Sequence, residues 1–195
     1  MKNQISETEE EEYEVASRMQ RKASVATNRK REAVGWVISL VAAVAIALAL
    51  RFFVFEFIRV DGESMEPTLK TDEYVFMEKV TYWFEEPKFG DIVICYYPHR
   101  AETFVKRVIG TEGDTIEIKG GTLFINNEAD TTYFSGYLEH DLAPVVVPEN
   151  SVFVMGDNRN ASMDSTNSSI GPLSYDMILG KALFVIWPFD KMQGL

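Results

Sequence analysis

The sequence predicts a mainly β protein, an antiparallel barrel or sandwich, preceded by one N-terminal transmembrane helix. The helix is indicated by an uncharged run from Val34 to Leu50, which is strongly apolar. The β domain is indicated by many short apolar runs between turn signals, with no long helical periodicity after the uncharged run. We therefore expect a tail over 1–33, an anchor helix over 34–51 and a β domain over 52–195.

The uncharged run covers seventeen residues, which as a helix span about 25 Å at about 1.5 Å per residue. A hydrocarbon core is about 30 Å thick, and Arg51 closes the shortfall by snorkelling. A cleaved signal peptide is the alternative, because Ala45-Ile46-Ala47 matches the small-x-small cleavage pattern. The long preceding segment and the absence of a polar stretch before the alanines favour an uncleaved anchor.

The tail over 1–33 carries seven Lys/Arg and seven Asp/Glu and almost no large apolar side chains. Such a composition predicts disorder. Three basic residues, Arg29, Lys30 and Arg31, adjoin the anchor, so the tail is expected in the cytoplasm and the β domain outside the cell membrane.

The β domain has its own pattern of strands and turns. Gly120-Gly121 joins two short alternating runs, which is a hairpin signal. Single helical turns are expected at 66–70 and 174–179, and 126–150 is interpreted as an irregular excursion. The candidate strands are Phe53–Val60, Glu73–Lys79, Asp91–Tyr97, Thr103–Ile109, Asp114–Lys119, Thr122–Ile125, Ser151–Met155 and Lys181–Trp187.

Charge and cysteine content exclude several classes of function. Residues 51–195 carry twelve Lys/Arg against twenty-three Asp/Glu, so the basic face that nucleic-acid binding requires is not expected. Cys95 is the only cysteine, so no internal disulfide forms, and its apolar strand setting predicts a core side chain. One cysteine and no clustered histidines predict no metal site and no cofactor.

Two residues suggest chemistry: Ser64, within 60–69, and Lys106, within 104–110. A serine hydroxyl becomes a good nucleophile when a neighbour takes its proton, and a lysine does so when it is neutral. In an extended strand Phe104, Lys106 and Val108 share one face, so partial burial is expected to lower the lysine pKa. Taken singly, each has an ordinary alternative: a lysine snorkelling from a strand, and a serine in a turn. The two histidines, His99 and His140, lie in expected loops and are poor candidates for the base.

Several blocks in order resemble type I signal peptidases, the membrane-anchored Ser/Lys endopeptidases that remove signal peptides from exported proteins. The blocks are the anchor, Gly62-Glu63-Ser64-Met65-Glu66-Pro67-Thr68-Leu69, Gly90-Asp91-Ile92-Val93, Lys106-Arg107-Val108-Ile109-Gly110, and Gly156-Asp157-Asn158-Arg159 with Ser162 and Asp164-Ser165. The single anchor and the short excursion resemble the compact forms typical of Gram-positive bacteria.

The resemblance implies roles for residues at the matching positions. Ser64 would be the acylating nucleophile and Lys106 the general base. Ser162 would hydrogen-bond to the lysine and orient it, while Asp164 would brace the site, with Arg107 as its expected partner.

Three positions depart from the family pattern or vary within it. Thr111-Glu112 stands where the family usually has x-Pro, which affects a turn only. Thr166 stands where the family often has an arginine, which makes the Asp164–Arg107 pair less secure. Gly62 occupies a position where some members have a serine that stabilises the oxyanion, so backbone N–H groups, including that of Ser64, would do so here.

The implied partners are the lipid bilayer and the signal peptides of exported preproteins, with small side chains near the cut. The peptide would lie extended beside 57–62 and 103–106 as an added strand. Its expected contacts are Phe57, Val60, Asp61, Phe104 and Val105. Aromatic residues at the start of the β domain are interpreted as core rather than lipid contacts: Phe52, Phe53, Phe55, Phe57, Trp83 and Phe84.

Two alternative functions remain at the level of the sequence. One is a membrane-anchored surface binding module, or a relative that has lost catalysis. The other is a sortase-type transpeptidase that would use Cys95 with a histidine, although the Thr-Leu-x-Thr-Cys setting of that class is absent.

Overall fold

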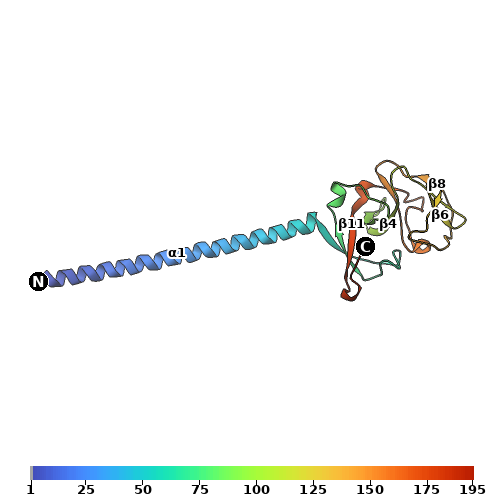
Figure 1. Cartoon of the computed structure of the whole chain (residues 1–195). Helices are drawn as coiled ribbons and strands as arrows, with labels where there is room; N and C mark the ends of the chain where they lie inside the picture. Colours follow the sequence, from blue (N-terminus) through green and yellow to red (C-terminus); the bar gives the residue numbers. More distant parts are fainter. Residues whose placement is uncertain (1) are drawn as a thin grey trace. The chain divides into compact units, whose positions relative to one another are not determined.

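The computed structural model describes the backbone of residues 2–195, and the side chains of Glu32 onward together with a few before it. The chain divides into two units, residues 1–49 and 50–195. One helix, α1, runs from Lys2 to Phe53 and makes up the first unit and the start of the second (Figure 1).

The disordered tail predicted for 1–33 differs from the structure, in which α1 includes those residues from Lys2 onward. Glu, Lys, Arg, Gln, Met and Ala are good helix formers, and they fill much of this segment. An i,i+4 pair between Arg18 and Glu14, with 3.2 Å between nitrogen and oxygen, adds local support. High charge and low hydrophobicity therefore do not exclude a helix here.

Within α1, the stretch Glu32–Phe53 is 22 residues long with a mean hydropathy of 2.5, and none of its most apolar window is buried within the protein. It is long and apolar enough to cross a bilayer. Among the described residues it is the one such stretch.

The second unit is mainly β, as predicted, and every strand pairing is antiparallel. One sheet has the order β1-β2-β11-β3-β4-β9-β10, with β12 on β11, and a small sheet has the order β7-β6-β5-β8. The strands are β1 (Phe55–Arg59), β2 (Tyr74–Glu78), β3 (Ile92–Tyr96), β4 (Thr103–Gly110), β5 (Thr115–Lys119), β6 (Thr122–Ile125), β7 (Glu128–Ala129), β8 (Leu142–Val146), β9 (Ser151–Met155), β10 (Leu173–Ser174), β11 (Ile178–Trp187) and β12 (Gln193–Gly194).

Strands that change partners curl the large sheet into a half-barrel. β11 pairs with β3 over its first residues and with β2 over the rest, with irregularities in register between. β4 likewise pairs with β3 from Thr103 to Arg107 and with β9 from Arg107 onward. Bulges of this kind bend a strand and raise its twist. The irregularity on β4 falls between Val108 and Gly110, so Lys106 lies two residues before it, where β4 passes from one neighbour to the next.

Three apolar clusters form the core, and β4 contributes to more than one of them. Val108 packs with Val93, Cys95 and Val154, whereas its neighbour Ile109 packs with the apolar face of the small sheet, including Ile116. Both faces of β4 are therefore buried at this end, which explains the unbroken burial from Lys106 to Gly110.

Short helical turns complete the unit. The one expected near 174–179 is a 3₁₀ turn, η3, over Tyr175–Met177. The remaining 3₁₀ turns are η1 (Thr81–Trp83), η2 (Arg159–Ala161) and η4 (Phe189–Lys191).

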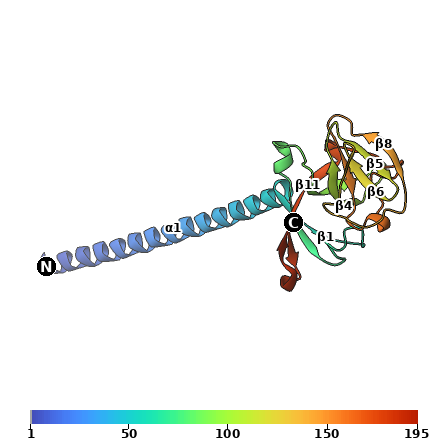
Figure 2. The same cartoon turned by 45° about the vertical axis from the view of Figure 1, so that its right-hand side comes forward.

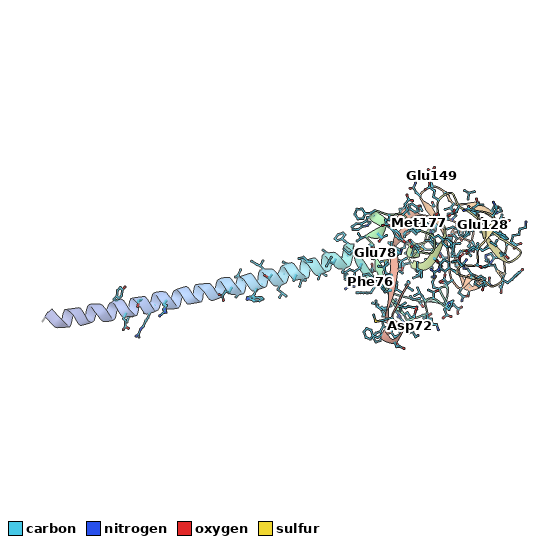
Figure 3. All side chains as sticks on the ribbon, in the orientation of Figure 1. Asp72, Phe76, Glu78, Glu128, Glu149 and Met177 are labelled. Atoms are coloured by element: carbon cyan, nitrogen blue, oxygen red, sulfur yellow. The ribbon has the colours of Figure 1, made fainter. Side chains whose placement is uncertain are left out.

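The prediction that the aromatic residues at the start of the β domain belong to the core is wrong for five of the six. Phe52, Phe53, Phe57, Trp83 and Phe84 are all exposed, between 52% and 82%, and Phe55 alone of that group is half-buried. For Phe57 the physical reason is the topology: β1 is an edge strand, and among the described residues no layer covers the face of the β1-β2-β11 sheet that carries Phe57. Phe52 and Phe53 end α1, and Trp83 and Phe84 lie in and directly after η1, outside the strands. Figure 3 shows Phe76 of β2 at this side of the unit and Glu128 of the small sheet at the other.

Candidate active site

Ser64 lies in a tight turn that follows β1 and is fixed by two core side chains. Met65 and Leu69 are both buried in the cluster beneath β1 and β2. The Leu69 N–H donates to the Met65 carbonyl at 2.9 Å, which closes the single helical turn predicted at 66–70. The buried neighbours hold the turn, and Ser64 itself is half-buried.

Lys106 meets Ser64 directly. Its Nζ lies 2.7 Å from Ser64 Oγ and 3.0 Å from the carbonyl oxygen of Val105, and the residue is 2% exposed. Burial lowers the pKa of the Lys106 amine, while Asp164, Cys95 and Asp157 oppose that shift to a lesser degree. A buried amine with a lowered pKa and a hydroxyl at hydrogen-bond distance is an arrangement that can move a proton from serine to lysine.

The predicted pair between Asp164 and Arg107 is wrong, because Arg107 pairs with Asp157. Arg107 donates from Nε and from its second terminal nitrogen to the two Asp157 oxygens at 2.8 and 2.7 Å, and both residues are buried. The register explains the choice: Arg107 lies opposite Met155, and Asp157 follows Met155 by two residues, so it reaches the same face.

Asp157 also joins the turn that carries Ser64 to the strand that carries Lys106. Thr68 Oγ1 donates to Asp157 Oδ2 at 2.5 Å, while Arg107 donates its remaining terminal nitrogen to the Gly90 carbonyl at 2.9 Å. We call Thr68, Arg107 and Asp157 the carboxylate latch. It fixes the position of Ser64 relative to Lys106 through a bidentate, charge-assisted contact.

Asp164 braces its own loop. It is 1% exposed, accepts the Gly156 N–H at 3.0 Å, and accepts Thr166 Oγ1 at 2.8 Å and Thr166 N at 3.2 Å. Thr166, which stands where the family often has an arginine, therefore supplies the partner of Asp164.

The predicted hydrogen bond from Ser162 to Lys106 is not present in the structure. The Ser162 hydroxyl is buried and has no hydrogen-bond partner among the described residues. Lys106 Nζ instead bonds to Ser64 and to the Val105 carbonyl. Ser162 nevertheless lies beside Ser64, because a Cβ added to Gly156 would meet Ser162 Oγ at 2.3 Å and the Ser64 carbonyl oxygen at 2.4 Å. Only glycine fits between them.

The turn that carries Ser64 also bonds through its backbone to the segment Gly156-Asp157-Asn158-Arg159. The Asn158 N–H donates to the Ser64 carbonyl at 3.0 Å, and Asn158 Nδ2 donates to the Glu63 carbonyl at 3.2 Å. Gly62, two residues before Ser64, has a positive φ of 91°, which a serine would adopt only with strain.

The residues expected to contact a peptide fall into two groups. Val60 is buried, Phe104 and Val105 are half-buried, and Asp61 is exposed. Phe57 instead lies on the exposed aromatic face, where its ring is 5.8 Å from that of Phe76. The strand pairings leave one side of β1 without a partner, and one side of β4 before Arg107.

Reasoning from the sequence missed Thr68 and Asp157 as functional residues. Both lie inside the quoted blocks, but 89 positions separate them. Asp157 could have been found from its place in the compact Gly156-Asp157-Asn158-Arg159 block, two residues after the end of a predicted strand.

Cys95 is a buried thiol on β3, as predicted. Burial raises its pKa to about 12, so the thiolate that a transpeptidase requires is not favoured. No group of three His, Cys, Asp or Glu side chains capable of holding a metal occurs among the described residues.

The fold and the site define a class of protein: a mainly β half-barrel in which a buried lysine on one strand bonds to a serine in the turn after another. The chain belongs to the signal peptidase family, peptidase S26, whose family model matches residues 33–187. Members of this family are serine proteases that remove signal peptides, and the bacterial ones are membrane-anchored.

Relatives match over most of their length. Signal peptidase I of Bacillus licheniformis is 39% identical over 178 residues, covering 86% of this chain and 95% of the relative. Signal peptidase I T of Bacillus subtilis is 40% identical over 169 residues, covering 81% and 87%. The crystal structure of a signal peptidase I from Enterococcus faecalis is 28% identical, with a TM-score of 0.43 over 50% of this chain and 97% of that chain.

Proposed function

We propose that this protein is a serine endopeptidase that removes N-terminal signal peptides from exported preproteins, with Ser64 as nucleophile and Lys106 as general base. The observation that carries the proposal is the 2.7 Å contact between Lys106 Nζ and Ser64 Oγ. It occurs where burial lowers the pKa of the lysine, in a chain that belongs to the signal peptidase family.

The reaction proceeds in two stages. Neutral Lys106 accepts the Ser64 proton as Oγ attacks the peptide carbonyl, and the resulting ammonium donates a proton to the leaving amine of the mature protein. Lys106, neutral again, then takes a proton from water, whose oxygen attacks the acyl-serine. As the bond to Oγ breaks, the ammonium returns the proton to Ser64 and the signal peptide leaves as a carboxylic acid. We assign to Ser162 the role of bonding to the amine while its charge changes, because its buried hydroxyl has no hydrogen-bond partner among the described residues.

The substrate is proposed to add a strand between β1 and β4. Both strands leave a side unpaired in the described structure, and unpaired strand edges bind extended peptides through main-chain hydrogen bonds. Val60, Asp61, Phe104 and Val105 border this position, so they are the proposed substrate contacts. Phe57 is reassigned to the aromatic face.

The exposed aromatic face is proposed to rest against the lipid bilayer. Phe57, Trp187 and Phe189 border one shallow hollow of this face, and Phe76, Phe184 and Met192 border a second. The C-terminal hairpin of β11 and β12 belongs to the same sheet as β1, with β2 between β1 and β11, and both views of the cartoon show it at the same side of the β unit as β1 (Figures 1 and 2). Together with an apolar Glu32–Phe53 preceded by basic residues, this supports a single-pass protein of the cell membrane with a cytoplasmic N-terminus and an extracytoplasmic β domain.

The test of the nucleophile compares the full-length wild type with Ser64→Ala and Cys95→Ala on a detergent-solubilised preprotein. Ser64→Ala should lose at least about 10³-fold in kcat, whereas Cys95→Ala should remain within about threefold of wild type, since a buried thiol acts as a small apolar side chain. Cleavage retained by Ser64→Ala would overturn the proposal. Loss confined to Cys95→Ala would favour a transpeptidase, and no cleavage by any variant would favour a binding module.

The test of the lipid contact uses Phe189→Ser, because Phe189 is 71% exposed at the end of β11. Reconstituted with a preprotein in vesicles, the variant should cleave about fivefold more slowly, since it loses apolar area at the interface. Cleavage of a short soluble peptide in detergent should not change. Val146→Ser, on the exposed edge of the small sheet, is the matched control, and an equal loss in both variants would contradict the assignment of the face.

A further inference from the structure

Tyr97 follows β3 directly and is one of the largest buried side chains in the unit. It is 2% exposed and packs in the cluster that contains Cys95 and Val108. Its ring stacks on that of Phe104, with centroids 4.0 Å apart and an angle of 9° between the planes. Phe104 shares a strand face with Lys106, so the tyrosine ring contacts the strand that carries the amine.

The Tyr97 hydroxyl reaches a different part of the site. It donates to the backbone carbonyl of Met163 at 2.7 Å, and Met163 lies between Ser162 and Asp164. Among the hydrogen bonds of the described residues, this is the one that the Met163 carbonyl accepts. Asp164 is fixed by its own bonds to Gly156 and Thr166, so the Tyr97 bond acts mainly on Ser162 and Met163, which are extended and irregular.

We propose that Tyr97 is a positioning residue for catalysis, which holds the segment 162–164 against the strand that carries Lys106. The inference rests on the proposed function, because it assumes that Lys106 is the base. Its ring is fixed by Phe104 and its hydroxyl by Met163, so Tyr97 links the lysine strand to the loop that places Ser162 and closes the site over the amine.

The hydroxyl remains a donor throughout the working pH range. Burial raises the pKa of Tyr97, and Cys95 and Asp164 add to that effect. Without this bond Ser162 and Met163 lose their link to the strand that carries Lys106, water reaches the amine, and the burial that lowers the lysine pKa is weakened.

The test uses full-length Tyr97→Phe in detergent with a preprotein substrate. The variant keeps the ring and loses only the hydroxyl, so kcat should fall about tenfold while KM stays within about twofold. The acidic limb of the pH profile should move upward by about half a pH unit or more, because the lysine is less desolvated. Tyr96→Phe is the matched control, since Tyr96 is the adjacent residue and is partly exposed; it should retain both kcat and the profile.

A purely structural role is excluded by rescue. Tyr97→4-aminophenylalanine keeps an N–H donor at the same place and should restore the profile and most of kcat, even where thermal unfolding shows that both variants are less stable. An unchanged kcat, or a lower melting temperature with an unchanged pH profile, would overturn the proposal. The Lys106→Met variant is assayed in parallel: retained cleavage there would refute the proposed function itself, independently of the result at Tyr97.

Discussion

Lys106→Met is expected to abolish signal-peptide cleavage and, at the same time, to stabilise the protein. Methionine fills a similar volume without an amine, so Ser64 loses its proton acceptor and kcat should fall by at least about 10³-fold. The apolar side chain removes a buried group whose charged form is disfavoured, so the free energy of unfolding should rise on the order of 1 kcal/mol near neutral pH.

The pH dependence of that stability gain follows from the lowered pKa of Lys106. The unfolded lysine binds its proton up to a pKa of about 10.4, whereas the folded one releases it at lower pH. In the wild type, stability therefore rises with pH in the window between the folded and the unfolded pKa. The gain from Lys106→Met should be full below that window and vanish above it.

Urea unfolding of wild type and Lys106→Met, at neutral pH and above the unfolded lysine pKa, measures this difference. Lys119→Met, at the exposed end of β5, is the control and should change neither activity nor stability appreciably. Cleavage that survives in Lys106→Met, or a loss of stability equal at both pH values, would contradict the assignment of Lys106 as a desolvated base.

Asp157→Ala is expected to cause the largest loss of stability of any single change at the site. It leaves the buried Arg107 guanidinium without its carboxylate and removes the acceptor of Thr68. Breaking a buried ion pair from one side costs about 3–5 kcal/mol, a large part of a typical stability of about 5–15 kcal/mol. Cleavage should fall as well, because the latch that sets Ser64 against Lys106 is lost.

The matched control is Arg59→Ala, which breaks the pair with Asp72 on the surface. Both of those side chains are about two-thirds exposed, and an exposed pair contributes about 1 kcal/mol or less. Denaturant unfolding should therefore show a loss in the free energy of unfolding that is several-fold larger for Asp157→Ala than for Arg59→Ala. A double mutant of Arg107 and Asp157 should lose less than the sum of the singles, and strict additivity would show that the two do not act as a pair.

Much of the fold could be predicted from sequence patterns a few residues long. Alternating residues predicted the strands around Lys106 and the hairpin at Gly120-Gly121, and the structure confirms antiparallel strands at those positions. The strand β8 was missed because Pro144 lies inside it, and proline argues against a strand. β8 is an edge strand, and Pro144 lies at the irregularity in its register on β5, between Leu142 and Val145, where a proline is tolerated.

The site, too, was predicted only in part. The proximity of Ser64 and Lys106, 42 positions apart, was expected from the resemblance of the blocks and from the apolar neighbours of the lysine. The partner of Arg107 was predicted wrongly, because two carboxylates, Asp157 and Asp164, lie in one block and only the register of β4 on β9 decides between them. That register depends on a bulge after Val108, which no local pattern in the sequence reveals.

The one cysteine of this sequence, Cys95, is buried on β3, and the sequence has no second cysteine with which it could form a disulfide. Folding of the β unit therefore requires no thiol oxidation and no isomerase that reshuffles sulfur bridges. Recombinant material made in a reducing cytosol, and handled in dithiothreitol throughout, should reach the same folded state as material exported from a cell.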